Sequence, residues 1–221
     1  MHRPAVDVKK RLLNGEPQHN FSLFLKATNM ARIRIQDENR EITDPQQISE
    51  FLAPFGIWYE KWDVDGRIDR DATDAEILAA YAPEVERLKA RGGFVTADVI
   101  NVKPETPNLD AMLQKFAKEH THSEDEVRFT VKGGGVFHIH PEGGPVFAVQ
   151  VESGDLINVP KGTQHWFDLC KDRNIRCIRL FQDMTGWSPA YVDNPVNAKY
   201  EALCLGPAYL EPVGMGSAVK I

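Results

Sequence analysis

Three histidines and one glutamate form the pattern in this sequence that can do chemistry. His120 and His122 are a His-x-His pair, Glu126 follows soon after, and His165 ends the downstream string PKGTQH. Side chains two apart on a β-strand share a face, so the upstream group can point one way while a neighbouring strand delivers the last imidazole. Three imidazole nitrogens and one carboxylate oxygen suit divalent iron, nickel, manganese, cobalt or zinc. We therefore predict a metal centre built from two separate β segments.

Four protein ligands around one ion indicate a catalytic centre. An octahedral ion held in this way keeps two adjacent open positions, enough for a bidentate substrate, whereas a closed structural zinc site has none. The opposing interpretation is that a histidine on a strand is only a hydrogen-bonded side chain. That interpretation is weak for two histidines and a glutamate at this spacing, followed by a third histidine after a Pro-x-Gly turn.

Five further side chains are candidates for the surroundings of the ion. Arg128 shares the predicted face of the ligands, where a permanent cation favours an anionic substrate. Phe167 lies two residues after His165, so it shares the strand face of that histidine and can line a pocket. Phe116 lies on the apolar side of a predicted amphipathic helix and can line the same pocket, although apolar residues of such helices more often pack in the core. Glu119 and Asp125 are an odd number of residues from the histidines, so on a strand they would face away from the metal. We therefore expect them at the surface or hydrogen-bonded in support of the ligands.

A second His-x-His pair, His138 and His140, repeats the spacing of the first. The nearest carboxylate, Glu142, falls in the turn PEGG, so it lacks the position that Glu126 has in the first pair. We interpret the second pair as imidazoles of the sheet surface or core and predict no second metal site.

Both groups of ligands resemble the two motifs of the cupin superfamily. The first motif is usually Gly, five residues, His-x-His, three or four residues, Glu, six residues and Gly. The second is Gly, five residues, Pro-x-Gly-x-x-His, three residues and Asn. This chain has the closing Gly133 and the opening Gly154, but Gln114 stands at the first glycine of motif one and Leu169 at the asparagine of motif two.

Within that superfamily the chain resembles acireductone dioxygenases. The resemblance lies in the strings EHTHSEDEVRF at 119–129, HWFD at 165–168 and MARI at 30–33, and it covers nearly all of residues 30–210. It implies a mainly β fold, a cupin double-stranded β-helix (jelly-roll) barrel with a few N-terminal α-helices. It also implies one Fe(II) or Ni(II) ion per chain, held by the four ligands named above.

The activity that the resemblance implies is oxidation of the acireductone 1,2-dihydroxy-3-keto-5-methylthiopentene by dioxygen in methionine salvage. The iron form would give 4-methylthio-2-oxobutanoate and formate, and the nickel form methylthiopropionate, formate and carbon monoxide. In the family Arg128 would help to generate the substrate dianion, and Glu119 and Asp125 would matter for metal incorporation and conformational change. Two alternatives stay open: another cupin dioxygenase acting on a thiol or diketone, and a non-oxidative cupin, either an isomerase or a binding module.

Composition limits the partners and the compartment. The formal net charge of −6 argues against nucleic acid, and no apolar run approaches the roughly 20 residues of a membrane span. The three cysteines Cys170, Cys177 and Cys204 are odd in number and show no Cys-x-x-Cys spacing. We therefore expect the cysteines to be thiols in a reducing cytoplasm. We also expect the protein to be a monomer that acts on a small molecule.

The chain divides into three parts. Residues 1–29 hold five basic and two acidic residues and no apolar run longer than five, so they lack the core of a secretory signal. We expect a non-structural extension there, a cupin domain over residues 30–210 and a flexible tail over residues 211–221.

Hydrophobic periodicity predicts helices before the metal ligands and strands after them. The expected elements are a strand near 33–35, a helix from Thr43-Asp44-Pro45 to Pro54, a strand over 56–62, one helix from Thr73-Asp74 to Gly92-Gly93, a strand over 95–102 and a helix over 109–116. After Glu119 short strands alternate with Gly- and Pro-containing turns, as is typical of an antiparallel sandwich or barrel.

Overall fold

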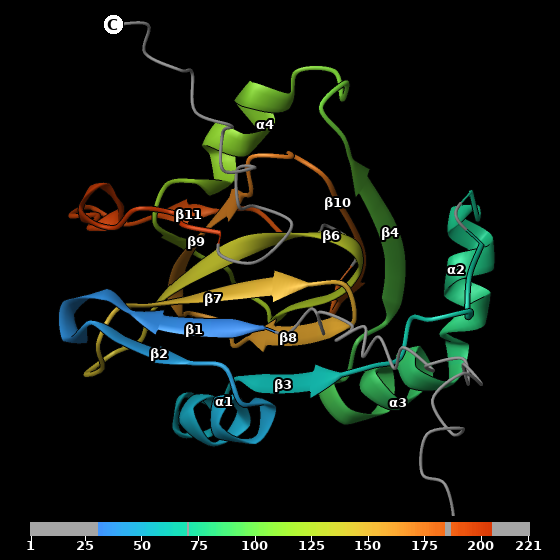
Figure 1. Ribbon diagram of the computed structural model, residues 1–221, viewed down its shortest axis with the longest axis horizontal. Helices are drawn as coiled ribbons and strands as arrows, with labels where there is room; N and C mark the ends of the chain where they lie inside the picture. The colour runs from blue at the N-terminus through green and yellow to red at the C-terminus, as the bar shows by residue number, and fades with distance from the viewer. Residues whose placement is uncertain (1–30, 70, 184–186, 205–221) are drawn as a thin grey trace, which may run out of the picture.

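Two antiparallel sheets that share one long strand form the body of the protein in this computed structural model, which describes residues 31–69, 71–183 and 187–204 (Figure 1). The strands are β1 (Arg32–Ile35), β2 (Arg40–Ile42), β3 (Trp58–Lys61), β4 (Thr96–Val102), β5 (His120–Thr121), β6 (Glu126–His140), β7 (Phe147–Glu152), β8 (Asp155–Val159), β9 (Gln164–Leu169), β10 (Ile175–Phe181) and β11 (Ala190–Tyr191). The α-helices are α1 (Pro45–Leu52), α2 (Asp74–Ala80), α3 (Ala82–Gly92) and α4 (Leu109–Phe116), and short 3₁₀ turns are η2 (Gln36–Glu38), η3 (Ala53–Phe55) and η4 (Asn197–Lys199).

The shared strand is β6, and it closes the barrel. Its first half pairs with β8 and β10, and its second half pairs with β7 and β9. The strand passes from one sheet to the other through Gly133 and Gly135. A Cβ on Gly133, which has φ +73°, would lie 1.9 Å from the carbonyl oxygen of Asn174, and a Cβ on Gly135 would overlap the ring of Phe167. The antiparallel barrel predicted from the turn spacing is confirmed.

Apolar side chains fill the barrel and also cover its outside. The inner cluster gathers residues of β1, β6, β7 and β9, such as Ile33, Phe137 and Phe147, together with the buried face of α1. The outer cluster packs α2 and α3 against β6, where Val127 and Phe129 are fully buried. Val127 and Phe129 alternate with Glu126 and Arg128 along β6, so they lie on the opposite face of the strand from that glutamate and arginine.

The helices follow the sequence predictions with one exception. α1 begins after Asp44, whose side chain accepts a hydrogen bond from the amide of Gln47, and it ends before Pro54. The single helix predicted from Thr73 to Gly92 is wrong, because α2 and α3 are separate and Tyr81 between them has φ −108° and ψ 14°. Pro83 has no N–H group to donate to the carbonyl of Ala79 four residues earlier, and its ring would crowd that carbonyl in a continuous helix, which accounts for the break.

The end of the described chain, residues 187–204, returns to the barrel, and we call it the C-terminal strap. It contains β11 and η4, and a disulfide joins Cys204 to Cys170, with 5.7 Å between the Cα atoms. The prediction that all cysteines are thiols is therefore wrong for this pair and right for the buried Cys177. A separation of 34 residues gives no pairing signal, since only the returning strap brings the two together.

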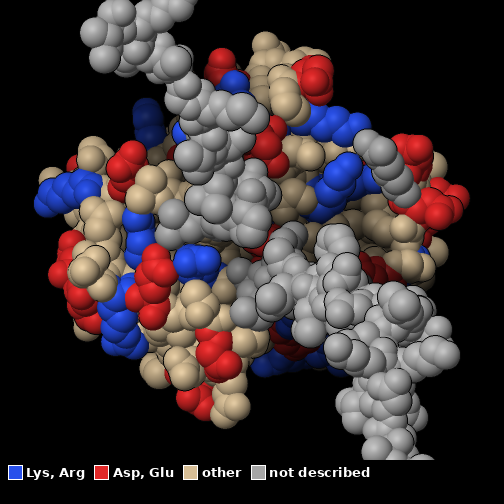
Figure 2. All heavy atoms as spheres, in the orientation of Figure 1, with Lys and Arg blue, Asp and Glu red and all other residues tan. Residues whose placement is uncertain are grey.

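Acidic and basic side chains are interspersed over the face drawn in Figure 2. Exposed ion pairs among the described residues, such as Arg32 with Glu41 at 2.9 Å, contribute little to stability. Among the described residues, no helix is both long enough and apolar enough to span a bilayer. The predicted extension at 1–29 and the predicted tail at 211–221 lie outside the described residues, and the domain boundaries stay a prediction.

Candidate metal centre

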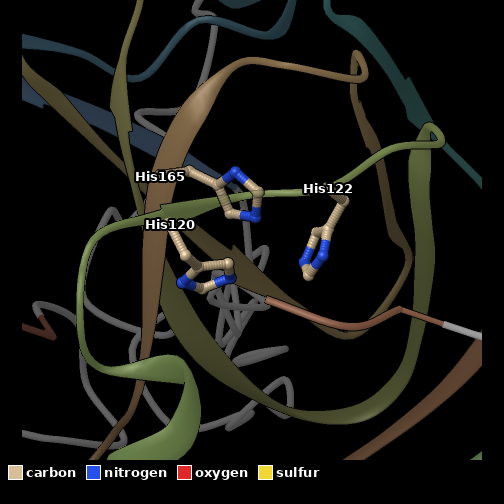
Figure 3. A group of neighbouring side chains, drawn as sticks. All are labelled: His120, His122 and His165. Atoms are coloured by element: carbon tan, nitrogen blue, oxygen red, sulfur yellow. The ribbon is translucent and has the colours of Figure 1, made fainter. Parts of the chain in front are cut away.

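The imidazoles of His120, His122 and His165 point toward one another inside the barrel (Figure 3). His120 lies in β5, directly opposite His165 of β9 in the antiparallel register, and His122 follows in the next turn. The three ring centroids are 4.6–5.1 Å apart, and one ligand nitrogen from each ring lies within 4.8 Å of the others. All three side chains are buried. The sequence-predicted convergence of the three histidines is present in the structure.

Each of these imidazoles has its Nδ1 atom bound to a backbone carbonyl oxygen. The pairs are His120 with Lys118 at 2.5 Å, His122 with Ser188 at 3.1 Å, and His165 with Thr163 at 2.8 Å. A carbonyl oxygen only accepts, so Nδ1 carries the proton and donates it. In the neutral ring the lone pair is then on Nε2, the atom left for an ion, and the ring orientation is fixed.

Glu126 completes the donor set. Its Oε2 atom lies 3.1 Å from Nε2 of His122 and 3.2 Å from Nε2 of His165, while Oε1 accepts a 2.6 Å hydrogen bond from Nε of Arg128. Two donors that sit about 2.1 Å from one ion at right angles are about 3.0 Å apart, so these separations fit shared coordination. Nε2 of His122 is buried and has no hydrogen-bond partner, which a cation would supply. The residues present therefore fit a divalent metal ion.

The protonation of the donors also suits a metal. Burial lowers the pKa of His120 to about 4, and the neighbouring His165 adds to the shift, so the ring is neutral at pH 7. Burial by itself would raise the pKa of Glu126, but the positive charge of the adjacent Arg128 guanidinium helps to hold that pKa well below its usual value. A ligand that is already deprotonated releases no proton when it binds an ion, so binding at neutral pH is favoured.

The route by which the ligands converge differs from the prediction. We expected His120, His122 and Glu126 on one face of a single strand. Instead β5 ends at Thr121, and β6 starts only at Glu126, so a turn places His122. This turn is fixed to the Pro-x-Gly turn before β9, because the amide of Gly162 donates to the carbonyl of His122 at 2.9 Å. A tied pair of turns, and not strand alternation, brings the upstream and downstream motifs together.

A narrow apolar cleft adjoins the centre. Its empty space is about 430 Å³, which includes a part open to solvent. The residues that line it are Ile100, Val102, Met112, Leu113, Phe116, Arg128, Phe167, Leu169, Ile175 and Arg179. The guanidinium carbon of Arg128 lies 5.0 Å from the ring centroid of Phe167 and 5.2 Å from that of Trp187. The structure thus places all three sequence-predicted cleft residues, Arg128, Phe116 and Phe167, on one cavity.

Residues in this cleft and beside it were missed by sequence reasoning. Arg179 is the register partner of Arg128 in the β6–β10 pair, so an alignment of the two strands would have found it. Its guanidinium also binds Asp98, with hydrogen bonds of 2.5 and 2.8 Å. Trp187 lies in the strap, 6.2 Å from the ring of His122, and no sequence signal places it there.

Glu119 and Asp125 are both engaged by neighbouring segments. The fully buried carboxylate of Glu119 accepts hydrogen bonds from Nδ1 of His140 at 2.6 Å and from the amide of Val196 in the strap at 2.5 Å. Asp125, which is half-buried, accepts from the amide of Lys161 at 2.9 Å. Both contacts fix chain segments that adjoin metal ligands.

The second His-x-His pair does not form a metal cluster in the described part of the chain. His138 is buried and stacks on Trp166 with ring centroids 4.7 Å apart and planes 8° apart, and His140 binds Glu119. The only group of three or more potential ligands among the described residues is the one at His120, His122 and His165. His138 thus lies in the core and His140 is partly exposed beside Glu119, a carboxylate partner that was not foreseen. That this pair binds no metal stays a prediction.

Comparison with known proteins gives one consistent result. The sequence profile of the ARD/ARD' family matches residues 27–189, a range that contains all four candidate ligands. Acireductone dioxygenases from Picosynechococcus sp. and Aquifex aeolicus are 44% and 42% identical over 171 and 175 residues, each covering 77% of this chain and 97% and 95% of the relative. The solved structure of acireductone dioxygenase from Bacillus anthracis, with a cadmium ion in its active centre, is 41% identical with a TM-score of 0.70 over 75% of this chain and 100% of its own. The predicted cupin barrel is confirmed by this likeness.

Proposed function

This chain belongs to the acireductone dioxygenase family, and on that premise we propose that it oxidises 1,2-dihydroxy-3-keto-5-methylthiopentene with dioxygen in methionine salvage. It is an enzyme of the dioxygenase class, like its named relatives. The observation that carries the proposal is the convergence of three imidazoles and Glu126 at the mouth of an apolar cleft that also holds Arg128.

The proposed cofactor is one Fe(II) or Ni(II) ion held by His120, His122, Glu126 and His165. When bound, the ion supplies a Lewis acid and a template for the reaction of the substrate with dioxygen. Three imidazole nitrogens and one carboxylate oxygen accept iron and nickel alike, so the choice of ion depends on supply as well as on the ligands. The relative from Bacillus anthracis holds cadmium in its active centre, which supports the same position for an ion here.

Arg128 has two tasks in this proposal. Its Nε atom donates to Glu126 and fixes the orientation of that carboxylate at 2.6 Å. The rest of the guanidinium faces the cleft among Phe137, Phe167 and Trp187, where little water competes for it. A permanent cation in such surroundings stabilises the deprotonated enediolate and so favours the dianionic form of the substrate.

The aromatic and aliphatic walls of the cleft receive the methylthio tail. Phe116 and Phe167 stand on two sides of it, and Met112 from α4 lines the space between the helix and the sheet. A short apolar tail is held there by exclusion of water, while the polar end of the substrate stays near Arg128.

Glu119 and Asp125 act as positioning residues in the proposed enzyme. Glu119 precedes His120 in the chain and ties it to His140 and to the strap. Asp125 precedes Glu126 and ties the first turn to the second at Lys161. Neither carboxylate is needed for proton transfer in this role, since each holds a ligand-bearing segment in place.

The proposed setting is a monomer in the cytoplasm that takes a small molecule and dioxygen and binds neither nucleic acid nor membrane. The net charge of −6 and the mixture of charges on the visible face support the exclusion of nucleic acid (Figure 2). The disulfide between Cys170 and Cys204 removes the argument for a reducing compartment from unpaired cysteines, so the cytoplasm rests on the proposed pathway alone.

Products identified by metal test the proposal. Protein stripped of metal is loaded with Fe(II) or with Ni(II) under nitrogen and then mixed with the acireductone and dioxygen. We expect 4-methylthio-2-oxobutanoate and formate from the iron form, and methylthiopropionate, formate and carbon monoxide from the nickel form. Bound metal without consumption of dioxygen would instead indicate an isomerase or binding module. Consumption with a thiol or diketone alone would indicate a different cupin dioxygenase.

A further inference from the structure

The C-terminal strap makes hydrogen-bonded and strand-pairing contacts with two of the proposed metal ligands. The carbonyl of Ser188 accepts the hydrogen bond from Nδ1 of His122, and Tyr191 of β11 is the register partner of His120. The amides of Val192 and Val196 donate to the backbone and the side chain of Glu119. The strap therefore contributes to the orientation of both histidines of the first His-x-His pair.

The start of the strap is also held by the buried Trp187, which packs on Phe181 with ring centroids 4.7 Å apart, whereas its end is held mostly by exposed interactions. The hydroxyl of Tyr200 donates to Asp37 at 2.8 Å, and its ring lies 6.1 Å from that of Trp166. Nη2 of Arg34 donates to the carbonyl of Glu201 at 2.9 Å. Water competes for hydrogen bonds at exposed positions, so each contributes little, and these bonds alone do not fix the end of the strap.

The disulfide is the covalent anchor of that end. Cys170 directly follows β9, the strand that carries His165, and it is 2% exposed. Cys204 is half-buried, so it is the more exposed residue of the pair. The bond closes a loop that contains β10 and the whole strap, and such a link limits the conformations open to the strap when it detaches.

We propose that Cys170–Cys204 is a thiol–disulfide exchange site for a protein or small-molecule dithiol, and that its redox state sets how long the strap holds His120 and His122 in their ligand positions. The second part rests on the proposed metal centre. With the bond intact the strap stays in register with β5. With the bond broken the strap detaches more often, and the ligands lose the support of Ser188 and Glu119.

The exchange has a balanced chemistry. A thiolate of the dithiol attacks Sγ of Cys204, which breaks the sulfur–sulfur bond, and Cys170 leaves as a thiolate and takes up a proton. The second thiol of the reductant then attacks the mixed disulfide and releases Cys204. The protein gains two electrons and two protons, and the dithiol becomes a disulfide. An oxidised dithiol reverses every step.

Two arguments favour exchange over a permanent crosslink. The first rests on the proposed function: disulfides in the cytoplasm, the compartment which that function implies, are usually transient, so the thiol pool there would open and close this bond. The remaining cysteine also gives a contrast, because Cys177 is fully buried and burial raises the pKa of its thiol to about 11. The thiol of Cys177 is therefore unreactive, and among the described cysteines only the Cys170–Cys204 pair is open to thiol exchange.

Release of metal tests the inference. Nickel-loaded protein is prepared oxidised and also after reduction by a dithiol that is removed by gel filtration under nitrogen, and nickel loss to excess chelator is timed. We expect release from the reduced protein to be roughly three- to tenfold faster. Cys204→Ser should release nickel at the fast rate whatever its redox treatment. Cys177→Ala, the matched control, should keep the difference between the two states.

Hydrogen exchange at the amides of Val192 and Val196 gives a second measurement that needs no metal. Both amides should exchange faster after reduction and in Cys204→Ser. Equal exchange and equal nickel release in the oxidised and reduced protein would overturn the inference, as would three reactive thiols in the unfolded oxidised chain. If no form binds nickel, the proposed metal centre fails, and the amide exchange still decides the behaviour of the strap.

Discussion

The two His-x-His pairs have the same spacing in the sequence but lie in different surroundings in the structure. At His120 and His122 the rings turn inward, each with its Nδ1 atom on a backbone carbonyl oxygen, and His165 joins them from β9. At His138 and His140 the strand is regular, and the side chains point to the outside of the barrel while Phe137 and Ile139 fill its interior. Spacing alone therefore does not make a metal site.

Three physical differences separate the pairs. The first pair has a third imidazole opposite it and a carboxylate, Glu126, with Arg128 to keep it ionised. Each of its rings also has a proton acceptor for Nδ1, which leaves Nε2 free. His138 has neither nitrogen bonded, and it gains its stability from stacking on Trp166. Whether a His-x-His pair can bind a metal thus depends on further metal-donor side chains nearby and on carbonyl oxygens that fix the tautomer of each ring.

Removal of one histidine from each pair should give the largest contrast. His122→Ala deletes a proposed ligand, and we expect the affinity for nickel or iron to fall by more than about 100-fold, because even indirect partners of a ligand contribute 10- to 100-fold. His138→Ala should leave the affinity unchanged and lower the free energy of unfolding by about 1–3 kcal/mol, since the ring is buried on Trp166. Metal content and urea denaturation measure both. Equal loss of metal in the two variants would remove the distinction between the pairs.

The next effect concerns the cation beside the first pair. Arg128→Ala should retain the metal and reduce kcat/KM by about 100- to 1000-fold, because a buried charge aimed at the developing anion is lost. Arg176→Ala is the control on β10, since that side chain pairs with Asp74 and does not line the cleft. It should stay within about twofold of the unchanged enzyme. If turnover survives in Arg128→Ala, the role of this residue in generating the dianion is wrong.

The ligands and the barrel were predictable because they are local patterns with strong chemistry. The span of α4 and the place of Phe167 on the cleft follow from spacing and periodicity, and the structure agrees. The spacing of the motifs also predicted that the three histidines converge, and they do, whereas their role as metal ligands stays a prediction. The break at Tyr81 needed only closer attention to Pro83. These features depend on neighbours in the chain or in one strand, which a sequence displays directly.

The features that were missed depend on segments far apart in the chain. The His140–Glu119 pair, the support of His122 by Ser188 and the Cys170–Cys204 bond all join residues that are 21, 66 and 34 positions apart. Each of these contacts forms because the strap or β6 packs beside β5 and β9. Local periodicity in the sequence does not predict such long-range contacts, since they depend on the closed topology of the barrel.

A pH experiment sharpens the contrast at His138. Burial lowers the pKa of this ring from 6.5 to about 4, with Arg34 adding to the shift and the backbone of Glu201 opposing it. Below pH 6.5 the unfolded chain takes up a proton that the folded chain refuses, so stability falls as the pH drops toward 4 and changes no further below it. Between pH 7.5 and 5 this group costs about 2 kcal/mol.

His138→Phe keeps the stacking on Trp166 and cannot take up a proton. Its free energy of unfolding, measured by urea titration, should fall by about 2 kcal/mol less than that of the unchanged protein between pH 7.5 and 5. The same slope in both proteins would show that His138 does not titrate as a buried neutral ring.

The smallest expected effect separates the carboxylates that accompany the two pairs. Asp125 binds the amide of Lys161 and ties the turn of the first pair, while Asp168 lies 3.7 Å from Nδ1 of His138 and is partly exposed. Asp125→Asn keeps a weaker acceptor for that amide, so we expect metal content to stay within about threefold and the free energy of unfolding to fall by about 1 kcal/mol. Asp168→Asn should change the unfolding free energy by less than about 0.5 kcal/mol and leave the metal content unchanged. A complete loss of metal in Asp125→Asn would mean that this carboxylate acts at the ion directly, because the loss of a turn contact alone leaves the four donors in place.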